Sequence, residues 1–202
     1  MIAPWLATVV LLLVVAVSRW CYDHRGRRYA QGKRAPLRSS AAFRPVYAWV
    51  RWSVPVAGLG ALWSTHPAWL PWRPGAVLQV LGLLLALAAL GLFVHAKRSL
   101  GRHYSPCHDA WLPDAVVQHG VYARIRHPIY TANLALLAGL AVGTGSGWLL
   151  LDALLVAAFY LPAARREERE LAAAHPQYRD YLARTGRFLP RLRRAANPAP
   201  AR

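Results

Sequence analysis

The feature that most constrains this chain is a run of nineteen residues, 76–94, without a single charged side chain. A helix of that length is about 30 Å long, which matches the hydrocarbon thickness of a bilayer. Of the 202 residues 56% are hydrophobic, yet the formal net charge is +17. These two properties conflict in a soluble domain but agree in a membrane protein, whose apolar residues fill the spans and whose basic residues lie in loops. We therefore expect an all-α integral membrane protein in contact with the lipid bilayer.

The other apolar runs predict four more transmembrane helices, five in all. They cover residues 2–17, 46–63 and the two halves of 129–162. Pro55 should kink the second helix, and Arg51 lies close enough to one membrane face to snorkel. The Gly-Thr-Gly-Ser-Gly segment at 143–147 divides the last run and predicts a helical hairpin for the last two spans. It is not a dinucleotide-binding fingerprint, which needs a preceding strand and a third glycine at a fixed spacing.

Basic residues alternate between the predicted loops. Lys and Arg number eight in 19–44, one in 64–75, five in 97–126 and ten from residue 165 onward. The positive-inside rule then places the N-terminus outside and the C-terminal helical tail in the cytoplasm, with the bacterial inner membrane as the expected location. Basic blocks between apolar runs also argue against nucleic-acid binding, which would need a basic patch on a folded polar domain.

The chain divides into three predicted regions. Residues 1–96 form a three-span membrane region with the basic loop 19–44. Residues 97–190 form a core of loop, hairpin 129–162 and helical tail, and residues 191–202 form a disordered basic tail. Cys21 and Cys107 do not indicate a disulfide framework, and the histidines lack metal-ligand spacing, so we expect no metal site. The oligomeric state stays open, although four small residues of the third span would allow close helix packing, namely Ala86, Ala88, Ala89 and Gly91.

Side chains able to bind a ligand or take part in catalysis lie in two segments on the predicted cytoplasmic side. Residues 118–130 read Gln-His-Gly-Val-Tyr-Ala-Arg-Ile-Arg-His-Pro-Ile-Tyr, and residues 165–171 read Arg-Arg-Glu-Glu-Arg-Glu-Leu. Tyr178, Tyr181 and Arg-Phe-Leu-Pro at 187–190 follow. Because a hairpin brings the ends of its two legs together, the two segments should be neighbours in space.

The order Gly-x-Tyr-x-x-x-Arg-His-Pro-x-Tyr, hairpin, Glu-Glu-x-x-Leu resembles the isoprenylcysteine carboxyl methyltransferase and phospholipid methyltransferase superfamily of integral membrane methyltransferases. Ser-Leu-Gly-Arg-His-Tyr-Ser at 99–105 is similar to another element of that family. The resemblance covers about residues 99–190 and does not reach the first two spans. It implies an enzyme that uses S-adenosyl-L-methionine, bound by the loop, the hairpin ends and the tail, to methylate a small lipophilic acceptor.

The resemblance implies a specific set of cofactor-binding positions. They are Asp114, Ala115, Val116, Val117, Gly120, Tyr122, His127, Pro128, Ile129, Tyr130 and Glu167, the stretch 114–117 acting through its backbone. The chemistry of the residues agrees with this. Arg126 or His127 can meet the cofactor carboxylate, Glu167 its ammonium, and the tyrosine rings its adenine or sulfonium. Pro128 suits the first turn of a helix, whose N-terminus favours an anionic group.

The candidate catalytic residues are His127, Glu168 and Arg126, with His119 as a further candidate base. A base is less necessary for a carboxylate or thiolate acceptor than for a phenol or amine. Each residue alone has an ordinary interpretation, such as a basic anchor, an interfacial tyrosine or an ion pair on a helix; only their combination indicates cofactor binding.

Two departures from the family pattern bear on the substrate and the tail. Prenylcysteine enzymes of the family place an arginine one turn before the first glutamate, where this chain has Ala163, which argues against a prenylcysteine substrate. The segment from Leu171 to Tyr178 is one residue shorter than usual, and His175-Pro176 should end a helix there. The alternatives are a membrane reductase of the sterol-reductase type and a non-catalytic membrane protein that keeps the fold.

Overall fold

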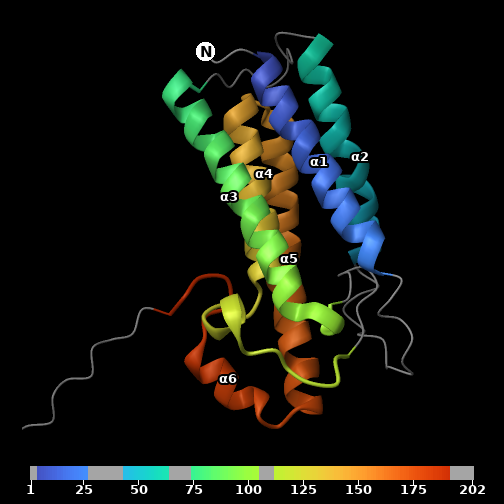
Figure 1. Ribbon diagram of the computed structural model, residues 1–202, viewed down its shortest axis with the longest axis vertical. Coiled ribbons are helices and arrows are strands. Elements are labelled where there is room, and N and C mark those ends of the chain that lie inside the picture. The colour runs from blue at the N-terminus through green and yellow to red at the C-terminus, as the bar shows by residue number, and fades with distance from the viewer. Residues whose placement is uncertain (1–3, 27–42, 64–73, 105–111, 192–202) are drawn as a thin grey trace, which may run out of the picture.

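The computed structural model describes residues 4–26, 43–63, 74–104 and 112–191. The described residues form helices and no strand, in the order α1 (Pro4–Gly26), α2 (Phe43–Trp63), α3 (Ala76–Leu100), α4 (Pro128–Thr144), α5 (Gly147–Ala174) and α6 (Tyr178–Arg184), with short 3₁₀ turns η2 (Gly101–His103) and η4 (Gly120–Ala123). Helices α1 to α5 form one elongated bundle, and α6 lies at the end where α5 finishes (Figure 1).

Two helices, α3 and α5, are long and apolar enough to cross a membrane, and residues 5–21 and 128–144 form shorter apolar helices. Large apolar side chains point outward along the bundle, among them Leu81, Leu84 and Leu85 of α3 and Leu151, Leu154 and Leu155 of α5. An apolar outer surface of this extent suits contact with lipid rather than water. The number of five spans and their orientation stay predictions.

Helices α1 and α5 both continue beyond the predicted spans. Helix α1 continues past Arg19 to Gly26, so the predicted loop 19–44 begins as helix; its part 27–42 lies outside the described residues. Helix α5 continues through Pro162 to Ala174, so the predicted last span and the first part of the predicted helical tail form one helix. A proline removes one backbone hydrogen bond but does not prevent the helix from resuming. The predicted disordered tail, apart from Arg191, also lies outside the described residues.

The predicted hairpin turn is confirmed between α4 and α5. Gly145 has left-handed φ and ψ of 68° and 22° and caps α4, and the backbone amide of Ser146 donates to the Ala141 carbonyl at 3.1 Å. This is a common way to end a helix, because glycine adopts the left-handed region without steric cost. The Ser146 hydroxyl in turn accepts from the Leu149 amide at the start of α5. His175-Pro176 ends α5, as expected.

Helices α3 and α4 approach each other so closely that their backbones touch. A Cβ placed on Gly139 would lie 2.6 Å from the Ala86 nitrogen and 2.7 Å from the Gly82 oxygen. A Cβ on Gly82 would lie 2.5 Å from the Gly143 nitrogen. Gly139 and Gly143 therefore form a small-xxx-small contact of the kind that lets membrane helices pack tightly.

The small residues predicted to pack in α3 divide between two faces. Ala86 and Ala89 are buried within the bundle. Ala88 and Gly91 are exposed, and a Cβ on Gly91 would meet nothing within 4 Å, so these two do not pack against another helix of this chain. The packed face is set by Gly82 and Ala86, one helical turn apart.

Helix α2 is joined to α5 by a buried polar contact. Asp152, 2% exposed, accepts hydrogen bonds from Trp49 Nε1 at 2.8 Å and Ser53 Oγ at 2.7 Å. The Trp49 and Trp148 rings lie 5.7 Å apart beside it. A buried carboxyl with both oxygens hydrogen-bonded avoids the cost of an unsatisfied polar group and fixes the register of the two helices.

Candidate functional site

The loop before α4 and the segment after α6 pair through their backbones. The Arg126 amide donates to the Gly186 carbonyl at 2.9 Å, the Gly186 amide to the Arg124 carbonyl at 3.2 Å, and the His127 amide to the Arg187 carbonyl at 3.0 Å. These bonds confirm that the two segments are neighbours. Gly186 is required there, because a Cβ at this position would collide with the Leu189 carbonyl.

Glu168 is the buried centre of a group that we call the carboxylate cluster, made of Glu168, Arg126, His127 and Arg187. Arg126 Nε donates to Oε1 at 2.8 Å, and Arg187 donates through Nε at 3.0 Å and through Nη2 to Oε2 at 2.6 Å. His127 Nε2 lies 3.2 Å from Oε1. Since a carboxylate only accepts, Nε2 carries the ring proton, which leaves Nδ1 of a neutral His127 as an acceptor.

The pKa of Glu168 reflects two opposing influences. Glu168 is 5% exposed and lies past the apolar part of α5, on its charged last turns. Burial alone would raise its pKa, but hydrogen bonds from His127, Arg187 and Arg126 outweigh burial and hold the pKa well below its usual value of 4.5. Glu168 is therefore an ionised acceptor of hydrogen bonds over the whole physiological pH range.

Arg126 also ties α6 to the cluster. Its Nη1 donates to the Leu182 carbonyl at 3.2 Å and to the Thr185 carbonyl. Thr185, 2% exposed, donates from its hydroxyl to the Tyr181 carbonyl at 2.6 Å. The guanidinium of Arg126 is thus shared between Glu168 and the end of α6, where it satisfies carbonyls that a helix C-terminus leaves free.

Glu167, one residue earlier, contacts a second group. This group consists of the stacked rings of Tyr130, Tyr160 and His127, and we call it the tyrosine stack. The Tyr130 and Tyr160 rings stack with centroids 4.4 Å apart, and the His127 ring stacks on Tyr130 at 5.1 Å. Tyr130 donates from its hydroxyl to Glu167 Oε2 at 2.8 Å. His127 Nδ1 lies 3.8 Å from the same oxygen, so His127 joins the two groups.

Adjacent glutamates thus have different surroundings, because successive residues of a helix point about 100° apart. The Glu168 side chain is 7% exposed and that of Glu167 is 25% exposed. Among the described residues, the hydrogen bond from Tyr130 and the approach of His127 Nδ1 both involve Oε2 of Glu167. Its Oε1 therefore remains able to accept a hydrogen bond from a bound group.

Tyr122 and η4 are held by α6. Tyr122 is buried, and its carbonyl accepts from the Tyr181 hydroxyl at 2.7 Å. Burial raises the pKa of Tyr181 to about 12, so this donor stays protonated. Gly120 has φ 60°, and a Cβ there would lie 2.8 Å from the Ser99 hydroxyl, which explains the glycine before Tyr122.

The remaining predicted cofactor positions lie at the same end of the bundle. His127 caps α4 and Pro128 begins it, as expected, and both are buried with Ile129. The stretch 114–117 follows Pro113, whose carbonyl contacts His175 Nε2 at 2.9 Å. Asp114 and Ala115 are exposed, whereas Val116 packs beside Tyr178 and Tyr181. His119, the further candidate base, is exposed on the loop.

Three residues of this site were not among the predicted positions. Arg187 enters the sequence pattern only as part of Arg-Phe-Leu-Pro, although it makes three of the hydrogen bonds to Glu168. Tyr160 and Asn133 read as ordinary residues of apolar helices, yet the Asn133 amide donates to the Tyr160 hydroxyl at 2.9 Å. A polar residue within an apolar span was the available signal for both.

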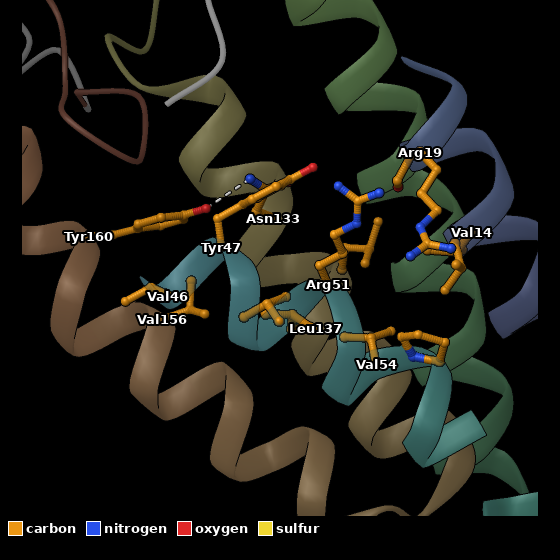
Figure 2. Close-up of a pocket in the computed structure, with 15 residues that line it drawn as sticks. Val14, Arg19, Val46, Tyr47, Arg51, Val54, Asn133, Leu137, Val156 and Tyr160 are labelled. Atoms are coloured by element: carbon orange, nitrogen blue, oxygen red, sulfur yellow. Dashed lines mark hydrogen bonds between the residues drawn. The ribbon is translucent and has the colours of Figure 1, made fainter. Parts of the chain in front are cut away.

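A cavity of about 150 Å³ lies between α1, α2, α4 and α5, and we call it the inter-helix cavity (Figure 2). Its wall is mainly apolar. Its polar lining side chains are Ser18, Arg19, Tyr47, Arg51, Asn133 and Tyr160. Because Tyr160 also belongs to the tyrosine stack, the cavity adjoins the predicted cofactor site. In the part of the chain that the structure describes, no group of three or more His, Cys, Asp or Glu side chains is placed to hold a metal ion.

The chain is similar to a protein family and to two curated proteins. The family model described as phospholipid methyltransferase matches residues 77–177, half of the chain. The cobalt-zinc-cadmium resistance protein CzcN of Cupriavidus metallidurans is 36% identical over 138 residues, which are 66% of this chain and 59% of that protein. The nickel-cobalt-cadmium resistance protein NccN of Alcaligenes xylosoxydans xylosoxydans is 34% identical over 136 residues, 65% of this chain and 59% of that protein.

The alignments therefore span less than two thirds of the length of these relatives. The family match includes His127, Glu167 and Glu168, and it ends before Arg187. The chain belongs to the phospholipid methyltransferase family, part of the isoprenylcysteine carboxyl methyltransferase-type superfamily of membrane methyltransferases.

Proposed function

We propose that this protein transfers a methyl group from S-adenosyl-L-methionine to a small lipophilic acceptor that reaches the site from the membrane. The observation that carries the proposal is the junction of His127, Tyr130 and Glu167 beside a cavity between the helices. We place this site on the cytoplasmic side of a bacterial inner membrane, following the distribution of basic residues.

The side chains present fit the cofactor's functional groups. Glu167 offers Oε1 to an ammonium, and the face of Tyr160 turned away from Tyr130 suits a sulfonium or an aromatic ring. Tyr130 holds Glu167 in place through its hydroxyl. The first amides of α4 point toward the same region and favour a carboxylate. Backbone contacts from 114–117 and a contact from Tyr122 complete the proposed set. When bound, S-adenosyl-L-methionine supplies an electrophilic methyl group on a positively charged sulfur.

The two glutamates have different proposed roles. Glu167 contacts the cofactor, whereas Glu168 is a positioning residue whose oxygens are already engaged by Arg126, Arg187 and His127. Glu168 is a poor base, because its pKa is held low. By holding the proton on Nε2, it leaves Nδ1 of His127 available to accept a proton from a phenol, thiol or amine acceptor. A carboxylate acceptor would need no base.

Binding of the cofactor tests the proposal directly. Purified protein in non-ionic detergent is titrated with S-adenosyl-L-methionine, S-adenosyl-homocysteine and NADPH. Glu167→Gln should weaken binding of both adenosyl compounds by about tenfold, since one charge-assisted hydrogen bond is worth roughly 1.4 kcal/mol. Glu170→Gln, one turn along the same helix, is the matched control and should bind like wild type. Failure of wild type to bind either adenosyl compound would overturn the proposal, and binding of NADPH alone would favour the reductase alternative.

The names of the two relatives suggest a biological setting for the reaction. We propose that the methylation contributes to resistance against cobalt, zinc, cadmium or nickel in the host cell. Deleting the gene should lower growth in the presence of these ions, and wild type but not Glu167→Gln should restore growth. Equal restoration by both would separate metal resistance from cofactor binding.

A further inference from the structure

The inter-helix cavity combines an apolar wall with two arginines, and this combination points to a class of ligand. Val14, Val50, Val54 and Leu137 form part of the wall, and Arg19 and Arg51 lie on the same cavity. We propose that the cavity binds an amphiphile whose apolar chain lies along this wall and whose anionic group, a phosphate or a carboxylate, is held by Arg19 and Arg51. This inference rests on the proposed function, because it names the class of molecule that supplies the methyl acceptor.

The charged side chains that line the cavity are all positive. The fifteen residues that line the cavity include no aspartate or glutamate. Of the carboxylates whose side chains the structure describes, none lies within salt-bridge distance of Arg19 or Arg51. In Figure 2 the two arginine side chains lie next to one another on the side of the cavity away from Tyr160. Two guanidinium groups at one cavity repel each other, and a bound anion replaces that repulsion with two attractive contacts.

The two arginines come from different helices. Arg19 is on α1 and Arg51 on α2, and the Arg19 guanidinium lies over the Trp52 ring, 5.5 Å from its centroid. A cation held over an aromatic face loses less side-chain freedom when it binds a ligand. An anion between the two arginines would also join α1 to α2. An amine head group would be repelled there, so the charge pattern discriminates between acceptors.

The inter-helix cavity adjoins the proposed cofactor site. Tyr160 lines the cavity and stacks on Tyr130, whose hydroxyl donates to Glu167. A ligand in the cavity therefore contacts Tyr160, which is itself part of the proposed cofactor site. The arginines come from helices outside the matched residues 77–177, so this selectivity belongs to the part of the chain that the family model does not cover.

The simpler explanation is that Arg19 and Arg51 anchor α1 and α2 at the membrane surface by snorkelling. Anchoring residues would not make the cavity prefer one ligand charge over another. The selectivity of the cavity for ligand charge therefore separates the two explanations.

The test compares four amphiphiles of equal chain length by calorimetry with the whole protein in non-ionic detergent: octanoate, octyl phosphate, octanol and octylamine. Wild type should bind the two anions about tenfold more tightly than octanol, and octylamine least. Arg19→Gln/Arg51→Gln should reduce this preference to about threefold or less. The matched control, Arg44→Gln/Arg98→Gln, removes the same charge from exposed positions outside the cavity and should keep the preference. Val54→Phe should weaken binding of octanoate and octanol alike by filling the cavity.

Equal affinity of wild type for octanoate, octanol and octylamine would overturn the inference, as would an undiminished preference in Arg19→Gln/Arg51→Gln. A further preference for octyl phosphate over octanoate, or the reverse, supports the inference and identifies the anionic group. Binding of S-adenosyl-homocysteine, measured on the same samples, should be unchanged in every variant. If wild type binds that compound without preferring anions, only this inference is wrong; if it prefers anions without binding the compound, the proposed function is wrong.

Discussion

Helices α1 and α2 are held in the bundle in a different way from α3, α4 and α5. Gly82, Gly139 and Gly143 bring the backbones of α3 and α4 into contact, and a two-residue turn joins α4 to α5. Helix α2 instead reaches α5 through hydrogen bonds to Asp152, and a cavity remains beside it. The family match covers the tightly packed part and neither of the first two helices. A closely packed frame of α3, α4 and α5 thus holds the proposed cofactor site, whereas α1 and α2 line the cavity that we propose for the acceptor.

We expect the largest loss of stability when Glu168, which binds Arg126 and Arg187 at the end of α5, is replaced. Glu168→Ala leaves Arg126 and Arg187 without their carboxylate, and we expect it to lower the free energy of unfolding by about 3 kcal/mol, the lower end for a broken buried pair because Arg187 is partly exposed. Denaturant titration in detergent measures the change. Arg169→Ala, an exposed neighbour on α5, is the control. A loss below about 1 kcal/mol would show that the carboxylate cluster does not hold α6 to the frame.

The second largest loss of stability is expected at the contact between α3 and α4. Gly139→Ala places a methyl group against the backbone of α3 and should destabilise the protein by about 2 kcal/mol, as overpacking commonly does. Gly91→Ala is the matched control on the open face of α3. It should be neutral or stabilise by up to about 1 kcal/mol, because alanine favours helix more than glycine does. Similar thermal unfolding temperatures for the two variants would contradict the comparison.

The third effect concerns α2 alone. Asp152→Asn keeps the shape but turns an amide donor toward Trp49 or Ser53, which should cost about 1–2 kcal/mol. Amide hydrogen exchange should rise in α2 and stay unchanged in α4. Affinity for S-adenosyl-homocysteine should also stay unchanged. Loss of that affinity would mean that the first two helices are not independent of the cofactor end.

The smallest effect is the response to acid. The pKa of Glu168 is lower in the folded protein than in the unfolded chain, so below about pH 4.5 the unfolded chain binds a proton that the folded protein does not. The stability from Glu168 is therefore fully present above that pH and is lost as the pH falls, by about 1.4 kcal/mol per pH unit. The stability difference between wild type and Glu168→Gln should shrink between about pH 6 and pH 3.5. A difference independent of pH would show that Glu168 is not ionised in the fold.

The helices and the hairpin could be predicted from the sequence because they depend on local properties. An uncharged apolar run determines a long helix, and glycines between two such runs determine a turn. The hairpin also predicted that His127, Tyr130 and Glu167 lie at one end of the bundle, because the first leg of a hairpin begins on the side where the second leg ends. The prediction from local properties failed after Arg19, where a loop was expected but α1 continues to Gly26.

The tertiary structure alone decided which faces of these helices meet. Gly82 rather than Gly91 touches α4, and Glu168 rather than Glu167 binds the two arginines. Arg126 and Glu168 are 42 residues apart in sequence, and Trp49 and Asp152 are 103 apart. Local composition determines that a helix forms, but the rotation of one helix against another depends on side chains of both partners. The site and the inter-helix cavity are products of that rotation, so they appear only in three dimensions.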